Sequence, residues 1–97
     1  MKIEDLDLEE QYDKTRRALA ECIEDENELF LQEMGFPAKL VSCVDEWVRV
    51  KFDGKSKESF VIETNLGLCS PNGERFGYYC LQVDKNGNVV DDFLVFE

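Results

Sequence analysis

Apolar residues recur every three or four positions between Asp7 and Gly35, and this spacing predicts one long helix over residues 7–35. On a wheel of 3.6 residues per turn, the apolar positions fall in one sector about 140° wide. This stripe consists of Leu8, Tyr12, Leu19, Cys22, Ile23, Leu29, Phe30 and Met34. Asp7 can accept hydrogen bonds from the first free amides, and Gly35 followed by Pro37 favours an end to the helix.

Glu26 lies near the middle of the apolar sector, where a carboxylate is unexpected. One interpretation is a half-buried acid or base with a raised pKa. The other is that the helix bends or breaks around residues 25–27, or that Glu26 reaches sideways to water. We favour the second interpretation, because no other chemical group is visible that would work with this carboxylate.

After Pro37 the apolar spacing changes to every second residue, which indicates strands. The pattern over residues 39–52 predicts either one long bent strand or a hairpin. A turn is expected over 53–57 and a strand over 59–64. Residues 65–74 contain two glycines and a proline, so we expect a loop of about ten residues, long enough to be of functional interest.

The last 22 residues give the clearest β signal. Two alternating segments, 76–84 and 88–96, flank Asn86-Gly87, the pair that best suits a two-residue type I′ turn. This turn pairs Val83 with Val90, Leu81 with Asp92, Tyr79 with Leu94 and Gly77 with Phe96 on one face, and Cys80 with Phe93 and Tyr78 with Val95 on the other.

These elements predict a single α+β domain over residues 1–97. We expect a long N-terminal helix packed on an antiparallel four- to five-stranded meander sheet. One helix covers one face of such a sheet, so the second face is either curled over by the sheet itself or exposed as an interface. Tyr78, Phe93 and Val95 are the candidate interface residues on that face.

Charge is concentrated in the predicted helix. The chain has a net charge of −11, and residues 1–33 hold 12 acids and 4 bases. The densest cluster, Glu21, Glu24, Asp25 and Glu28, is a candidate binding surface for a basic protein. A solvated acidic face that only keeps the chain soluble is the alternative. Basic residues are few and scattered, which argues against direct binding to nucleic acid.

Composition narrows the class of protein. With 43% hydrophobic residues, the chain is too apolar for a disordered acidic tail. It has no run of 18 apolar residues, so we expect no membrane span. The start of the chain, MKIEDLDLEE, is acidic where a signal peptide is basic and then apolar. We therefore expect a cytoplasmic protein.

Catalytic and metal-binding signatures are weak. The chain has no histidine, and Cys22, Cys43, Cys69 and Cys80 are too widely spaced for a typical zinc site. Cys69, in the predicted loop, is the one candidate nucleophile or thiol sensor, yet it lacks an activating base. We therefore expect no enzyme activity, cofactor or metal.

Residues 84–88 superficially resemble a calcium-binding loop, because Asp84, Asn86 and Asn88 alternate. The required glycine and the final glutamate are not at the positions that such a loop needs, and the hairpin turn explains the same residues.

The leading hypothesis is a small, acidic, non-enzymatic protein that binds a basic protein partner, with an inhibitor- or immunity-like role. The alternative is a homodimeric structural or accessory subunit that pairs through the second sheet face.

Overall fold

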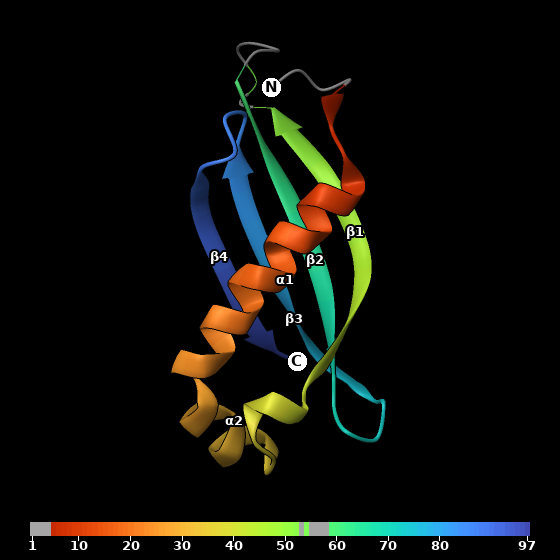
Figure 1. Ribbon diagram of the computed structural model, residues 1–97, viewed down its shortest axis with the longest axis vertical. Helices are drawn as coiled ribbons and strands as arrows, with labels where there is room; N and C mark the ends of the chain where they lie inside the picture. Colours follow the sequence, from red (N-terminus) through yellow and green to blue (C-terminus); the bar gives the residue numbers. More distant parts are fainter. Residues whose placement is uncertain (1–4, 53, 55–58) are drawn as a thin grey trace.

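The computed structural model describes residues 5–52, 54 and 59–97, and it confirms the α+β class (Figure 1). Two helices precede a four-stranded antiparallel sheet whose strands lie in sequence order. The elements are α1 (Leu8–Asp25), α2 (Asn27–Met34), a short 3-10 turn η2 (Ala38–Leu40), β1 (Ser42–Phe52), β2 (Phe60–Cys69), β3 (Arg75–Asp84) and β4 (Val89–Phe96). None of the described helices is long and apolar enough to cross a membrane.

The helical segment is divided in two, so the prediction of one helix over 7–35 is wrong at its middle. Glu26 leaves helical geometry, with φ −108° and ψ 17°, while its amide still donates to the carbonyls of Cys22 and Ile23. A continuous helix would have directed the Glu26 carboxylate into the apolar stripe, where its desolvation is costly. The break avoids this cost and confirms the interpretation of a bend around residues 25–27.

Both ends of the helical segment are as predicted. Asp7 Oδ1 accepts a hydrogen bond from the Glu10 amide at 3.3 Å, which caps α1. Gly35 ends α2 in the left-handed conformation, with φ 79°, and its amide donates to the Leu31 carbonyl.

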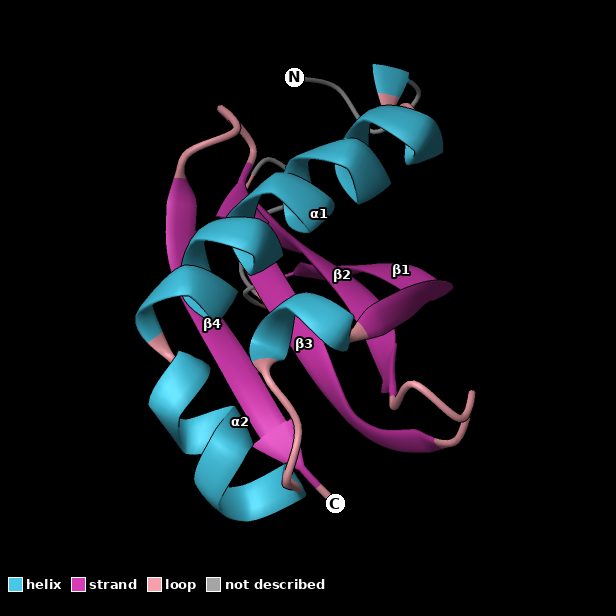
Figure 2. Ribbon diagram, turned by 60° about the horizontal axis from the view of Figure 1, so that its bottom comes forward, coloured by secondary structure: helices cyan, strands magenta, loops and turns pink. Residues whose placement is uncertain are grey.

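Helix α1 crosses one face of the sheet diagonally (Figures 1 and 2). Two contacts hold it at the sides: Arg16 pairs with Asp45 on β1, and Lys14 Nζ donates to the Gly87 carbonyl in the β3–β4 turn. Between them lies the core, which consists of Leu19, Phe60, Ile62, Leu66, Leu68, Tyr79, Leu81 and Val83.

Helix α2 closes one end of the sheet through aromatic contacts. The ring of Phe30 lies edge-on to Phe96, with centroids 5.0 Å apart, and to Phe76 at 6.2 Å. Phe36 packs against Phe76 from the segment that follows α2. Phe30 is fully buried in this cluster. It belongs to α2, which begins after the break at Glu26.

Residues 42–52 form one strand, which decides between the two alternatives left open for 39–52. The strand carries a bulge at Glu46, because Asp45 pairs with Leu66 whereas Trp47 pairs with Asn65. The turn expected over 53–57 lies outside the described residues, apart from Gly54.

Half of the loop predicted over 65–74 is strand. Residues 65–69 belong to β2, and only a short turn remains, in which Ser70 N–H donates to the Glu74 carbonyl and Gly73 has φ 85°. Alternation along β2 continues through the core-facing positions Phe60, Ile62, Thr64, Leu66 and Leu68. The polar and glycine residues between them conceal this pattern in the sequence.

The β3–β4 hairpin has the predicted register but not the predicted turn. Its loop is a three-residue one, in which Asp84 N–H donates to the Asn88 carbonyl and Gly87 has φ 84°. The extra loop residue shifts the pairing by one, so Val83 pairs with Val89 and not with Val90. A bulge at Val90 restores the register, and the other five predicted pairs are confirmed.

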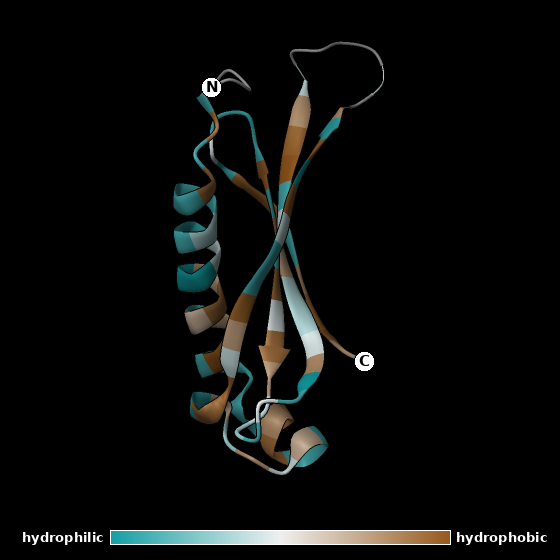
Figure 3. Ribbon diagram, turned by 90° about the vertical axis from the view of Figure 1, so that its right-hand side faces the viewer, coloured by the Kyte–Doolittle hydropathy of each residue, from teal (hydrophilic) through white to brown (hydrophobic). Residues whose placement is uncertain are grey.

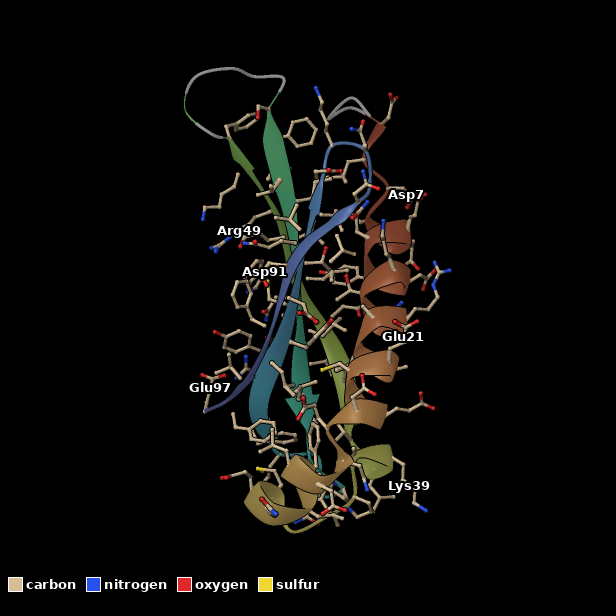
Figure 4. All side chains as sticks on the ribbon, turned by 90° about the vertical axis from the view of Figure 1, so that its left-hand side faces the viewer. Asp7, Glu21, Lys39, Arg49, Asp91 and Glu97 are labelled. Atoms are coloured by element: carbon tan, nitrogen blue, oxygen red, sulfur yellow. The ribbon has the colours of Figure 1, made fainter. Side chains whose placement is uncertain are left out.

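The two faces of the sheet differ in their cover. Helix α1 lies along one face (Figure 3), and Arg49, Asp91 and Glu97 project from the opposite side (Figure 4). No described element covers this second face, which we call the open face. Trp47 and Phe93 on it are 37% and 42% exposed.

Candidate functional site

The structure does not bring the seven predicted partner-binding residues onto one surface. Those of the helical segment lie on the helix side of the molecule, and those of the hairpin lie on the open face. The first set is Glu21, Glu24, Asp25 and Glu28, and the second is Tyr78, Phe93 and Val95.

The acidic cluster itself is divided. Glu21 and Asp25 are four residues apart and line a groove between α1 and β4. Glu24 lines a different hollow, beside Pro37 and Lys39, and Glu28 belongs to the first turn of α2. The break at Glu26 therefore prevents a continuous acidic face along one rod.

The groove between α1 and β4, which we call the acidic groove, has a volume of about 440 Å³. Carboxylates form its rim and apolar groups its floor. The rim consists of Glu21, Asp25, Glu26 and Asp92. The floor consists of Ala18, Cys22, Tyr79 and Leu81, and the exposed Val89 completes the lining at the edge of the groove.

Sequence reasoning misses two of the rim residues. Glu26 is recognisable in the sequence only as a misplaced carboxylate, and the helix break places it at the rim. Asp92 is predicted to face Leu81, a core residue, so its position on the helix side follows from the register. What the sequence does not show is that α1 ends beside β4.

No basic side chain in the described part of the chain forms an ion pair with any of the four rim carboxylates. Asp92 accepts a hydrogen bond from the Tyr79 hydroxyl at 2.8 Å. Burial, together with this bond and the Asp92 charge, raises the pKa of Tyr79.

The acidic rim also affects the pKa of the Cys22 thiol in the floor of the groove. Burial raises the pKa of the Cys22 thiol, and the negative charges of Asp92, Glu26 and Asp25 raise it further. A thiol held protonated in this way is a poor nucleophile.

The strand register arranges the open face in three rows that cross the whole sheet. The polar row is Arg49, Glu63, Gln82 and Asp91. The aromatic row is Trp47, Asn65, Cys80 and Phe93. The valine row is Val44, Gly67, Tyr78 and Val95. Residues opposite one another on neighbouring strands point to the same side, so each row forms a line of neighbouring positions.

The polar row contains a buried carboxylate. Glu63 is only 4% exposed, and it accepts hydrogen bonds from Arg49 Nε and Gln82 Nε2, both at 2.6 Å. Burial raises the pKa of Glu63, but these bonds and the Arg49 charge outweigh burial and lower the pKa below its ordinary value. The Arg49 guanidinium also stacks on Trp47, 4.6 Å from the ring centroid.

A second ion pair fills the bulge in β1. The Glu46 carboxylate accepts from Arg75 Nε and Nη2, at 2.8 and 2.9 Å, and from Asn65 Nδ2 at 2.8 Å. The hydrogen bonds from Arg75 lower the pKa of Glu46. Arg75 also pairs with Glu97. A Cβ on Gly67 would lie 2.4 Å from Glu46 Oε2, so glycine makes room for this carboxylate.

Asn65 lies at the centre of the open face with an unused acceptor. Its side-chain amide is committed to Glu46, while its buried Oδ1 accepts no hydrogen bond from the described residues. The surrounding hollow has a volume of about 570 Å³ and is lined by residues of the polar and aromatic rows, with Tyr78 and Arg75.

Cys69 is not the exposed thiol that the predicted loop implies. It ends β2 and is 8% exposed, because the strand continues through the region assigned to the loop. All four cysteines are free of disulfides. Asp84 Oδ1 accepts from the amides of Asn86 and Asn88, as expected of a turn. Within the described ranges, no three Cys, Asp or Glu side chains cluster as metal ligands do.

Comparison of the chain with protein-family models, curated proteins and solved structures finds no significant match.

Proposed function

We propose that the protein is a small, acidic, non-enzymatic binding protein whose acidic groove takes a segment of a basic protein partner. The observation that carries the proposal is the convergence of four carboxylates over an apolar floor, with no ion pair to a described basic side chain. A surface that served only for solubility would not need the apolar floor.

The groove defines the chemistry of the partner. Lysine and arginine have long apolar stems and a charged end, so they can cover the floor while the cation reaches the rim. A segment with two or more such residues and one apolar side chain matches both parts of the groove. The net charge of −11 also attracts a basic partner over a distance and raises its rate of association.

This mode of binding suits an inhibitor- or immunity-like role. A basic surface that normally contacts an anionic ligand is masked when an acidic protein occupies it. Neither a cofactor nor a bond-forming step is required for such an effect.

The test is capture of partners on the immobilised full chain, with variants that remove two rim charges. Glu21→Gln with Asp25→Asn changes the groove, whereas Glu9→Gln with Glu33→Gln removes the same charge elsewhere on the helices. We expect the groove variant to capture a basic partner at least tenfold less well, at roughly 0.1 M salt, and the control variant to retain it.

Two results would contradict the proposal. One is an equal loss in both variants, which would indicate a general charge effect. The other is a partner retained equally at about 0.5 M salt, because exposed charge pairs are strongly screened there.

A further inference from the structure

The polar row of the open face has opposite charges at its two ends. Arg49 lies on the edge strand β1, and Asp91 lies on the other edge strand, β4. Similar side chains occupy the two ends of the other rows: Trp47 and Phe93 in one, Val44 and Val95 in the other. Each row therefore complements its own reversed copy.

A twofold axis produces this reversal. If the axis runs parallel to the strands, between β2 and β3, it places β1 of one copy over β4 of the other and β2 over β3. Such an interface is isologous, because every contact occurs twice. Sheets that stack in this way keep their strands nearly aligned, about 10 Å apart.

We propose that two copies of the chain stack through their open faces about this axis. Arg49 then lies opposite Asp91 of the second copy, and Trp47 lies opposite Phe93. In the valine row, Val44 lies opposite Val95 of the second copy, and Tyr78 lies opposite Gly67, whose missing side chain is replaced by the Glu46 carboxylate of the same chain. This inference goes beyond the acidic groove and does not depend on it.

Two carboxylates of the open face are already neutralised by ion pairs within their own chain. Glu63 is paired with Arg49, and Glu46 is paired with Arg75, within one chain. Covering these pairs leaves neither carboxylate isolated, and isolated charges are what makes a buried interface costly. Asn65 lies opposite Cys80 of the second copy, and both side chains are buried within their own chain.

The area is sufficient for a stable dimer. Four strands about 4.8 Å apart and about ten residues long form a face of roughly 600 Å² in projection. Two such faces bury about 1,200 Å² in total, which reaches the range of stable protein interfaces. The acidic groove lies on the helix side and stays accessible in this dimer.

Reciprocal variants test the axis directly. Trp47→Lys and Phe93→Glu each remove an aromatic contact and place a charge against an apolar ring. In a mixture of the two variants, one aromatic contact is retained, and the two introduced side chains, which belong to different copies, form an ion pair. We expect sedimentation equilibrium at about 50 µM to show dimers for the native chain, at least tenfold weaker association for each variant alone, and dimers again in the mixture.

Circular dichroism establishes that each variant is folded. If one of the first pair does not fold, Val44→Lys and Val95→Glu provide a second reciprocal pair. A native chain that is monomeric at about 50 µM overturns the proposal, and so does a mixture of folded variants that remains monomeric. The groove variant Glu21→Gln with Asp25→Asn should dimerise normally, so failure of the dimer and failure of the groove are distinguishable.

Discussion

At the scale of single residues, three polar side chains of the open face each have defined hydrogen-bond partners. Glu63, Glu46 and Asn65 are each committed to partners on neighbouring strands. Their partners depend on the bulge in β1 and on the sheet register, neither of which is visible in local sequence. The cap at Asp7 and the left-handed Gly35 were predictable, because each depends only on adjacent residues.

The buried carboxylate of Glu63 makes stability depend on pH. Folding lowers its pKa from the ordinary value of 4.5, so the unfolded chain binds more protons than the folded chain between these two pKa values. Its contribution is complete above about 4.5 and is lost as the pH falls through the folded pKa.

We expect Glu63→Gln to lower the free energy of unfolding by about 1–3 kcal/mol at pH 7, and by less at pH 3. Urea unfolding of both proteins at the two pH values measures this difference. A cost that is the same at pH 3 and pH 7 would show that ionisation of Glu63 does not contribute.

Gly67 and Glu46 should be energetically coupled. A methyl group at residue 67 displaces the Glu46 carboxylate from Arg75, so Gly67→Ala should cost about 1–2 kcal/mol. In a Glu46→Ala background the same change has no carboxylate to displace and should be nearly neutral. A double-mutant cycle measures the coupling, and additive costs would contradict the proposed close approach.

At the scale of elements, the class and order of the elements and the outer ends of the helical segment were predictable, whereas the end of β2 and the β3–β4 turn were not. Alternation along β2 is interrupted by Asn65 and Gly67, whose roles lie in the network around Glu46. The β3–β4 turn and the bulge at Val90 are two irregularities that cancel, so most predicted pairs are correct although the turn is not. A bend or break around residues 25–27 was part of the favoured interpretation of Glu26, although the helix was predicted as one element.

Gly77 on β3 lies directly against the backbone of β4. A Cβ there would lie 2.1 Å from the Val95 carbonyl oxygen, and backbone atoms have little freedom to move away. Gly77→Ala should therefore cost about 2–3 kcal/mol, like other overpacked sites. Thermal unfolding measures the loss, with the exposed Val89→Ala as a control. A cost below about 0.5 kcal/mol would mean that the hairpin can separate at this position.

At the scale of the whole molecule, two surfaces on opposite sides of one sheet have different chemistry. The carboxylates of the acidic groove form no ion pair with a described basic side chain, whereas the open face carries ion pairs such as Arg49–Glu63 and Arg75–Glu46. The sequence predicts an acidic helix and an apolar second face. It does not predict that the acids divide at Glu26 or that the rows complement themselves, because both features depend on tertiary placement.

Net negative charge should make the fold sensitive to salt. Repulsion among the acids opposes folding, and salt screens exposed charges more than the paired, buried ones. We expect the melting temperature at pH 7 to rise between roughly 0.01 and 0.3 M NaCl. A melting temperature that falls over this range would show that the ion pairs of the sheet and helix outweigh the repulsion.

The acidic groove is tested most directly by chemical-shift mapping of the isotopically labelled full chain during titration with a short lysine- and leucine-containing peptide. The account predicts the largest shifts at Ala18, Cys22, Asp25 and Asp92, and their loss when Glu21→Gln and Asp25→Asn are combined. Shifts that spread evenly over the outer surface of α1, or that gather on the open face, would contradict it.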